Sequence, residues 1–376
     1  MSAQHPLLKK INIDSTSNIH DAFVKIRDLG LSCKIHDTKL IVKYPKSLKY
    51  SDKDYIRTSR GIIIDYETKK VINRSLEGSL DITTFNKIVP NWNSVVIEEC
   101  LDGVLLNVYY DNDKWNISTK FCLNADESKF RMDHTFRQLF DSLFVLDFNI
   151  LDKSYTYSFL LQHTLSRNVS LIRKNKLYHL ESTNNVTGDK IQIKLPGLNY
   201  PKILKFRNKI NELNVNSVEE LQSIANNLRW TNPGYMLYSE DRKYRSKVEN
   251  FNFVEVQNLV KDHGNINYLL LDSMYKKKNI SKILRYYPEY RPKLIALSKS
   301  IYDYSTNLHA YYIKCKVKKV FVDLERIYRK PLCDLHNLYK NNQKNGNKNF
   351  KITYAEVCNL LSTYDIAYLH SIICNN

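Results

Sequence analysis

The stretch that decides the fold is Ser94–Phe121, with the sequence SVVIEECLDGVLLNVYYDNDKWNISTKF. Asp111–Asp113 has the composition of a turn, and Glu98–Gly103 is a short polar segment between two apolar runs. Gly103 gives the backbone the freedom that a tight turn requires. Both an ordinary hairpin and a turn that presents a reactive group fit this pattern. The β-branched and aromatic runs predict three strands: Val95–Ile97, Val104–Tyr110 and Trp115–Phe121.

Strand and helix patterns are mixed on both sides of this stretch. From about Asn250 the pattern becomes helical and stays so to the end of the sequence. Upstream of that point, apolar periodicity and a capping box predict helices over Asn18–Leu29, Asp126–Phe144 and Ser217–Leu228. Runs of β-forming residues predict further strands over Ser32–Ile35, Leu40–Tyr44, Arg60–Asp65, Ser154–Gln162, Lys176–Ser182 and Asn232–Tyr238.

Short motifs in a fixed order carry a family resemblance. The segment SRGIIID (59–65) is followed by TTFN (83–86) and then by a strand that ends in x-x-Asp-Gly at Asp102 and Gly103. Together they resemble the covalent nucleotidyltransferases and, more narrowly, the bacteriophage-type RNA ligases that repair cleaved tRNA. In that family the turn reads Lys-x-Asp-Gly, and the lysine amine attacks the α-phosphate of ATP. The resemblance implies an α+β nucleotidyltransferase domain of antiparallel sheets with helices, followed by an all-α domain.

Three positions that carry the chemistry in this family are changed here. Cys100 stands in place of the lysine, and no other lysine lies between Lys87 and Lys114. Leu160 and Pro233 stand where the family has glutamates. The resemblance therefore implies a pseudoenzyme that has lost adenylyl transfer, and we assign no catalytic residue. A cysteine nucleophile is disfavoured, because the acidic residues around Cys100 should raise the pKa of its thiol.

Other positions of the family's pattern are retained or conservatively replaced. Gly234 matches, Arg245 replaces the first lysine of a Lys-x-Lys pair, and Lys247 matches the second. Phosphates are bound by cationic side chains, so the resemblance predicts a set of nucleotide- or phosphate-binding residues. These are Arg60, Asp102, Gly103, Lys120, Arg245 and Lys247.

Composition and charge indicate a polyanionic partner. The 376 residues carry a formal net charge of +18, and 27 of them are tyrosines that could stack on bases or simply fill the core. Nucleic acid is the simplest partner, and the family resemblance favours RNA over DNA, although phosphate contacts do not distinguish the two. The seven cysteines are odd in number, and neither a secretory segment nor an apolar run of membrane-spanning length is present. We expect an intracellular, cytoplasmic protein without membrane association. The composition also fits an AT-rich viral genome, with a viral factory or virion as the alternative location.

We expect two domains, a nucleotidyltransferase-like domain over residues 1–249 and a basic helical domain over 250–376. The segment Phe251–Asn376 has 20 Lys and Arg against 10 Asp and Glu, so it carries +10 of the net charge. Its lysine clusters fit either a solvated surface or contacts with nucleic-acid phosphates. The predicted nucleic-acid-binding residues are Lys276, Lys277, Lys278, Lys314, Lys316, Lys318 and Lys319.

Signals for a metal or for a second kind of site are weak. Cys333 and His336 have a zinc-like spacing, but no second pair accompanies them. Glu98, Glu99 and Asp102 could hold a metal, although a solvated turn beside basic residues is the simpler interpretation. No phosphate-binding loop of the Gly-x-x-x-x-Gly-Lys type is present. We expect no metal site and no cofactor, unless the protein is an active enzyme that uses ATP and Mg²⁺.

Three hypotheses for function follow. The leading one is an RNA-ligase-like protein that has lost adenylyl transfer and binds nucleic acid or a nucleotide through a basic groove. The second is an active ATP-dependent RNA ligase with a rearranged site. The third is a structural or packaging protein that uses the fold as a scaffold.

Overall fold

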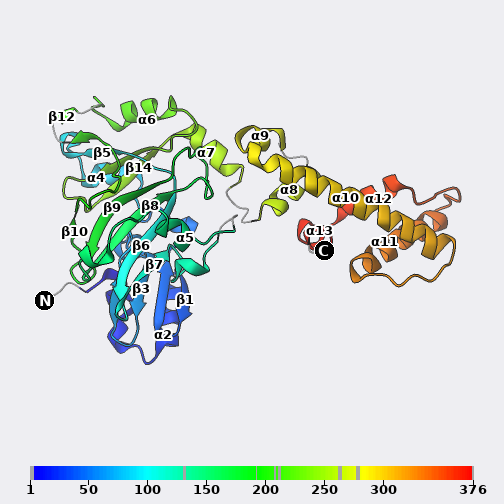
Figure 1. Cartoon of the computed structure of the whole chain (residues 1–376), viewed down its shortest axis with the longest axis horizontal. Helices are drawn as coiled ribbons and strands as arrows, with labels where there is room; N and C mark the ends of the chain where they lie inside the picture. The colour runs from blue at the N-terminus through cyan, green and yellow to red at the C-terminus, as the bar shows by residue number, and fades with distance from the viewer. Residues whose placement is uncertain are drawn as a thin grey trace. The chain divides into compact units, whose positions relative to one another are not determined.

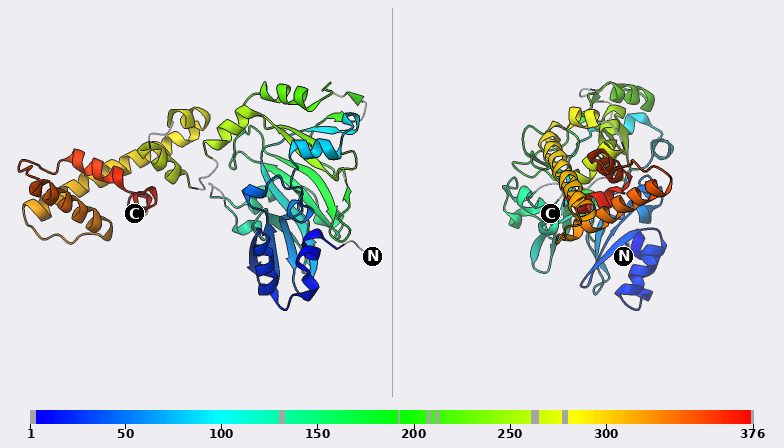
Figure 2. Two further views of the ribbon diagram at one scale, coloured as in Figure 1. Left: turned by 180° about the vertical axis from the view of Figure 1, so that it is seen from behind. Right: turned by 90° about the vertical axis from the view of Figure 1, so that its right-hand side faces the viewer.

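The structure is a computed structural model that describes residues 4–129, 133–191, 193–206, 209–210, 213–260, 265–276 and 280–374. The chain forms two compact units, Met1–Gln257 and Asn258–Asn376. The first contains three antiparallel sheets with short helices, and the second is helical (Figure 1 and Figure 2). The predicted α+β fold of antiparallel sheets followed by a helical region is therefore confirmed. Among the described residues, none of the helices has the length and apolar character needed to cross a membrane.

The first sheet is built from the N-terminal part of the chain. Its four strands pair in sequence order: β1 (Ser32–His36), β2 (Lys39–Lys43), β3 (Arg60–Asp65) and β4 (Lys70–Asn73). The predicted helix is present as α2 (Ile19–Asp28), and the Asn18 side chain accepts a hydrogen bond from the Asp21 N–H at 2.8 Å. Helices α1 (Pro6–Ile11), α2 and α3 (Asp54–Arg57) share a hydrophobic core with apolar residues of β1 to β4.

The second sheet contains two of the three strands of the central stretch. Its order is β10 (Lys190–Ile191), β9 (Lys176–Asn184), β8 (Tyr155–Gln162), β6 (Val104–Asp111) and β7 (Lys114–Thr119). One face buries a core with aromatic residues of helix α5 (Phe136–Asp141). A smaller cluster of Ile41, Ile63 and Tyr109 joins β6 to the first sheet.

The third sheet collects strands that are far apart in the sequence. Its order is β12 (Lys209–Ile210), β11 (Ile203–Phe206), β5 (Val96–Glu99), β13 (Gly234–Tyr238) and β14 (Arg245–Glu249). Helices α4 (Ile82–Ile88) and α6 (Val218–Asn226) contribute to its core. The predicted capping interaction of α6 is present, because the Ser217 side chain accepts from the Glu220 N–H at 3.2 Å. Helix α7 (Phe251–Asn258) follows β14.

The hairpin interpretation of Glu98–Gly103 is wrong. Strand β5 pairs with β11 and β13 in the third sheet, whereas β6 pairs with β7 and β8 in the second, so the segment between them crosses from one sheet to the other. Gly103 is needed for space and not for a special dihedral angle, because a Cβ atom there would lie 2.6 Å from the Leu161 carbonyl oxygen.

The long helix predicted over Asp126–Phe144 is also wrong. The structure has a 3₁₀ turn at Ala125–Glu127 and only the short helix α5 after it, while residues 130–132 lie outside the described residues. Helix α5 begins at its own capping box, in which the Thr135 and Gln138 side chains bond each other's backbone N–H groups.

All the regular secondary structure in the described part of the second unit is helical. Its longest helix, α10, runs on into a π-helical turn at Ile313–Val317. The aromatic residues Tyr304 and Tyr328 stack between α10 and α11, with ring centroids 4.8 Å apart. The helices are α8 (Ile266–Tyr275), α9 (Ile280–Tyr286), α10 (Arg291–Tyr312), α11 (Arg326–Lys344), α12 (Tyr354–Thr363) and α13 (Ile366–Ile373).

Candidate phosphate-binding site

The crossing between β5 and β6 brings together the three positions that depart from the family pattern. The Cys100 N–H donates to the carbonyl of Gly234, which follows Pro233, at 3.1 Å. On the other side of the crossing, Gly103 lies against the side chain of Leu160. The sheet pairing thus places positions 100, 160 and 233 around one short segment, although they are far apart in the sequence.

Three cationic side chains, Arg60, Arg245 and Lys247, interact electrostatically with Cys100, and Lys120, Lys43 and Lys49 extend this group beyond Arg60. We call these six residues the cation cluster. Each member interacts electrostatically with its neighbours. The charge of Lys120 interacts with those of Arg60, Lys43 and Lys49, and Arg60 interacts with Arg245 and with Cys100. Cys100 is coupled in turn to Lys247 and Arg245. Most of the cluster comes from four strands. Lys43 ends β2, Arg60 begins β3, Lys120 follows β7, and Arg245 and Lys247 lie in β14.

One carboxylate offsets part of this charge. Glu249 Oε1 lies 3.2 Å from Lys247 Nζ and 3.3 Å from Lys49 Nζ. Lys247 and Lys49 hold the pKa of Glu249 below its usual value, although burial acts in the opposite direction. Two of the other cations are close to aromatic rings, with Lys43 Nζ 3.8 Å from the Phe121 ring centroid and Lys120 Nζ 5.0 Å from that of Tyr44.

Burial and mutual repulsion act on the protonated amines. Burial, together with the neighbouring charges of Arg60, Lys43 and Lys49, lowers the pKa of Lys120 to about 8. Burial also lowers the pKa of Arg60 and of Lys43. Because like charges held close together are unfavourable in a half-buried site, a bound anion would offset the repulsion within the cluster.

We expect the affinity of the cluster for a phosphate ligand to fall as the pH rises above 8. The pKa of Lys120 is about 8 in the folded chain and 10.5 in the unfolded chain, so an anion that favours the protonated amine must bind together with a proton. If one proton binds with the ligand, the affinity falls by about tenfold for each pH unit well above 8. Titration calorimetry with pyrophosphate in buffers of different ionisation enthalpy measures this uptake. A pH-independent affinity with no proton uptake would contradict the assignment.

The same pKa has the opposite consequence for the stability of the unliganded chain. Between pH 8 and 10.5 the unfolded state binds more protons at Lys120, so the contribution of this residue to stability rises over that window. It is lost as the pH falls through 8. A Lys120→Met variant should lack both effects.

Cys100 is poorly suited to act as a nucleophile. Burial raises the pKa of its thiol, and the neighbouring Asp102 and Glu249 raise it further, while Lys247 and Arg245 act in the opposite direction. The net direction is upward, so the thiol form prevails. The side chain is buried and fills space between the sheets.

The predicted phosphate-binding role of Asp102 does not fit its contacts. Its Oδ2 accepts hydrogen bonds from the Val169 N–H at 2.9 Å and the Ser170 N–H at 2.8 Å. These bonds hold the loop after β8, and the neighbouring Gly103 carbonyl accepts from the Asn168 side chain at 3.1 Å. Asp102 and Gly103 therefore support the loop in this structure.

The three acidic residues considered as a metal site point to different partners. Glu98 is buried and pairs with Arg242, with the shorter contact at 2.7 Å. Glu99 Oε1 accepts from the Lys202 N–H at 2.9 Å, and Asp102 binds the loop described above. Within the described ranges, no group of three or more His, Cys, Asp and Glu side chains is placed to hold a metal ion. Cys333 and His336 therefore belong to no such group.

A buried ionic network lies beside the cation cluster, and sequence reasoning did not predict it. Glu77 pairs with Arg57 and with Lys190, whose Nζ lies 3.1 Å from Glu77 Oε1. The Arg245 guanidinium also donates to the Glu77 carbonyl oxygen. This network anchors Arg245 between the first and third sheets.

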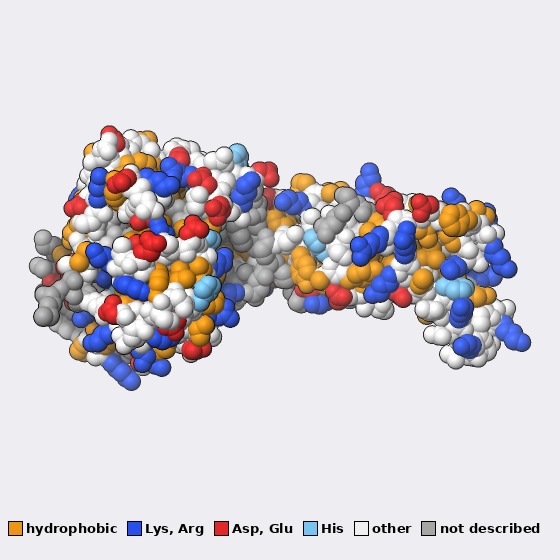
Figure 3. All heavy atoms as spheres, turned by 90° about the horizontal axis from the view of Figure 1, so that it is seen from below, with side chains coloured by type: hydrophobic (Ala, Val, Ile, Leu, Met, Phe, Trp, Pro, Cys, Tyr) orange, Lys and Arg blue, Asp and Glu red, His pale blue; other side chains and the backbone are white. Residues whose placement is uncertain are grey.

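The predicted nucleic-acid-binding lysines lie in the second unit. Lys276 is exposed and forms a salt bridge with Asp272, whereas Lys277 and Lys278 lie outside the described residues. Lys314, Lys316, Lys318 and Lys319 are exposed. Basic side chains are spread over the surface of both units (Figure 3).

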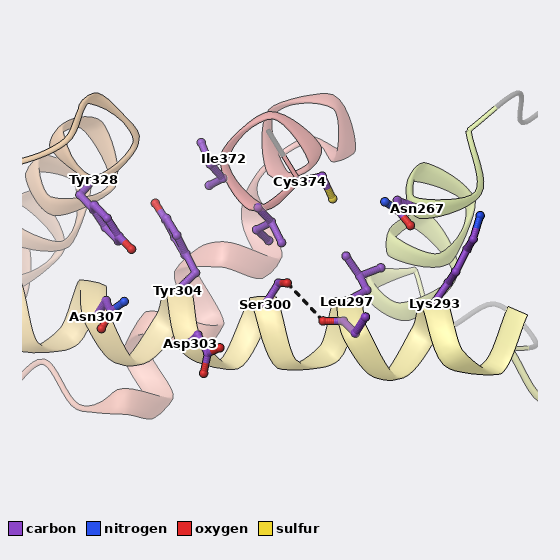
Figure 4. Close-up of a pocket in the computed structure, with 12 residues that line it drawn as sticks. Asn267, Lys293, Leu297, Ser300, Asp303, Tyr304, Asn307, Tyr328, Ile372 and Cys374 are labelled. Atoms are coloured by element: carbon purple, nitrogen blue, oxygen red, sulfur yellow. Dashed lines mark hydrogen bonds between the residues drawn. The ribbon is translucent and has the colours of Figure 1, made fainter. Parts of the chain in front are cut away.

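The second unit also contains a cavity of about 550 Å³ along α10 (Figure 4). Its lining mixes polar residues such as Lys293, Ser300 and Asp303 with apolar ones such as Leu297 and Ile372. Among the described residues, none of those predicted from the sequence to bind phosphate or nucleic acid lines it.

Comparison with known proteins gives one sequence relative. No protein-family model matches the chain. The chain is 25% identical over 236 residues to a protein of Autographa californica nuclear polyhedrosis virus that is described by prediction as a bifunctional polynucleotide kinase/RNA ligase. The match covers 57% of this chain but only 32% of the relative, so it spans about a third of the viral protein. It confirms the predicted resemblance to RNA ligases.

Solved structures of ligases show weak overall similarity. An ATP-dependent DNA ligase of Aquifex aeolicus, 13% identical, has a TM-score of 0.43 over 75% of this chain and 74% of its own. An archaeal ATP-dependent RNA ligase, 10% identical, has a TM-score of 0.41 over 76% and 72%. An RNA ligase mutant of Naegleria gruberi with ATP and Mn, 11% identical, has a TM-score of 0.38 over 49% and 58%. We transfer no residue role from them.

Proposed function

We propose that the first unit binds the phosphates of a nucleotide or of a nucleic-acid strand through the cation cluster, and that it does not transfer adenylate through position 100. The observation that carries the proposal is the grouping of six cations that starts at the Cys100 segment, where Glu249 is the one carboxylate paired to them among the residues that the structure describes. A phosphate group supplies the negative charge that such an arrangement lacks.

The loss of adenylyl transfer is supported by the residues at the three altered positions. The thiol of Cys100 has a raised pKa, and neither Leu160 nor Pro233 can hold a metal ion or accept a proton. Binding needs only the cations, which are retained, whereas covalent transfer needs an amine nucleophile and carboxylates as well.

RNA is the ligand that we favour among polynucleotides. The viral relative is described as a polynucleotide kinase/RNA ligase, and the match covers more than half of this chain. The cation cluster by itself contacts phosphates and does not select the sugar.

The loss of transfer predicts an intact mass that does not change on incubation with ATP and Mg²⁺. The same sample should nevertheless bind ATP reversibly in titration calorimetry, because the cations do not depend on the nucleophile. A Cys100→Lys variant serves as the control for the missing amine, and we expect it to remain unlabelled because positions 160 and 233 also lack carboxylates. An added AMP on the unmodified chain would overturn the proposed loss and favour the active ligase.

A further inference from the structure

The connection between α10 and α11 has an unusual surface, and we call residues 313–321 the α10–α11 loop. It begins as a π-helical turn, in which the Lys318 N–H donates to the Ile313 carbonyl at 2.9 Å. The Val320 N–H then donates to the Lys314 carbonyl at 3.0 Å, which closes the turn. Lys319 has a φ of 54°, a left-handed conformation that few non-glycine residues adopt. The backbone is thus folded into a compact turn.

Both charged and apolar side chains of this loop face solvent. Lys314, Lys316, Lys318 and Lys319 are exposed, and in the part of the chain that the structure describes none of them forms a salt bridge. Phe321 is 92% exposed, and Val317 and Val320 are 61% and 52% exposed. Exposed apolar side chains of this size beside unpaired cations are a common sign of an interaction surface.

Helix α11 adds to the same surface. His336 interacts electrostatically with both Lys316 of the loop and Lys340 of α11. The ring of His336 is nearly parallel to that of Tyr339, with an interplanar angle of 11° and centroids 6.3 Å apart. Helix α11 thus has two stacked rings, His336 and Tyr339, and one of them interacts with a lysine of the loop.

We propose that the α10–α11 loop is a second contact site for single-stranded nucleic acid, in which Phe321 stacks on an unpaired base and the lysines contact the flanking phosphates. Proteins that bind single strands combine aromatic platforms with a basic track in this way. The site is distinct from the cation cluster, lies in the other unit and does not depend on the function proposed for the cluster.

An anionic membrane is the alternative partner, and the geometry favours nucleic acid over it. Membrane-surface segments are usually amphipathic helices with one broad apolar face and a separate basic face. Here the lysines and the apolar residues alternate along a tight turn, and only Val317, Val320 and Phe321 are exposed apolar groups of the loop. That is little apolar area for insertion but sufficient for stacking one base.

The test uses the full chain and a fluorescein-labelled single-stranded oligouridylate, with affinity measured by anisotropy as a function of salt. We expect Phe321→Ala to weaken binding roughly tenfold without changing the salt slope. The double variant Lys318→Gln/Lys319→Gln should lower the slope of log K against log salt by about 1.4, the value for two phosphate contacts on a single strand. Matched controls are Tyr302→Ala and Lys293→Gln/Lys299→Gln on α10, all exposed in the same unit.

Each outcome separates this site from the cation cluster. If the loop variants bind like the controls while Lys120→Met weakens binding, the loop proposal is overturned and the cluster proposal stands. The reverse pattern overturns the cluster and supports the loop. If Phe321→Ala abolishes co-sedimentation with phosphatidylserine-containing vesicles but leaves oligouridylate binding unchanged, the loop is a membrane contact and the proposal fails.

Discussion

Lys120→Met should weaken the binding of ATP or pyrophosphate by about tenfold to a hundredfold at pH 7, the loss expected for one charge-assisted hydrogen bond. The same variant should stabilise the unliganded protein by roughly 1 kcal/mol, because it removes one of several like charges from a half-buried site. Affinity is measured by titration calorimetry, and stability by urea unfolding. The substitution should thus lower the ligand affinity and raise the stability of the free protein, and both changes follow from the repulsion within the cation cluster.

Lys114→Met is the matched control for this experiment. Lys114 is the first residue of β7, and its side chain is exposed, whereas Lys120 directly follows the last residue of the same strand. We expect it to change neither the affinity nor the stability appreciably, since an exposed lysine is well solvated. If Lys120→Met destabilised the free protein and left the affinity unchanged, Lys120 would be a structural residue and the cluster would not be an anion site.

Gly234→Ala should destabilise the first unit by at least about 3 kcal/mol, among the largest effects of any single substitution in the chain. Gly234 has a φ of 113°, and a Cβ atom there would lie 2.1 Å from the Val248 carbonyl oxygen. The overlap would force β13 and β14 apart at the residue whose carbonyl accepts from Cys100. Urea unfolding followed by tryptophan fluorescence measures the loss.

Gly30→Ala, in the same unit, separates the two causes of that effect. Gly30 also has a positive φ, of 78°, but the nearest atom to its Cβ position, Leu48 Cδ1, would lie at an ordinary contact distance of 3.9 Å. This control therefore reports the backbone cost alone, about 1 kcal/mol. An equal loss of unfolding free energy at the two positions would show that the close approach of β13 and β14 at Gly234 does not add to the cost of the substitution.

The sequence predicted strands more reliably than their pairing. The runs around Val95–Ile97 and Val104–Tyr110 correspond to β5 and β6, since β-branched residues alternating with polar ones form strands in any suitable context. Their assignment to different sheets depends on partners more than forty residues away, such as β8 and β13. Local periodicity contains no information about such partners, which is why a hairpin was the natural but wrong expectation.

The candidate site was partly predictable for the same reason. Arg60, Lys120, Arg245 and Lys247 were identified from short motifs, and the structure brings them together around Cys100, although their role in binding stays a prediction. Lys43 was missed because only the pairing of β2 with β3 places it beside Arg60. Lys49 was missed because it follows a 3₁₀ turn at Lys46–Leu48 and meets Glu249 and Lys120 only through the tertiary fold. Asp102 accepts hydrogen bonds from the backbone of Val169 and Ser170, contacts that no motif could reveal, and its role in binding also stays a prediction.

The most direct test of the central claim is the salt dependence of RNA binding by the unmodified chain, compared with Lys120→Met. We predict saturable binding of a 5′-phosphorylated single-stranded RNA at low salt, with log K falling linearly as log salt rises. Lys120→Met should bind more weakly and lower the slope by about 0.7, the value for one phosphate contact. Undetectable binding at low salt, or an affinity that does not change with salt, would contradict the account.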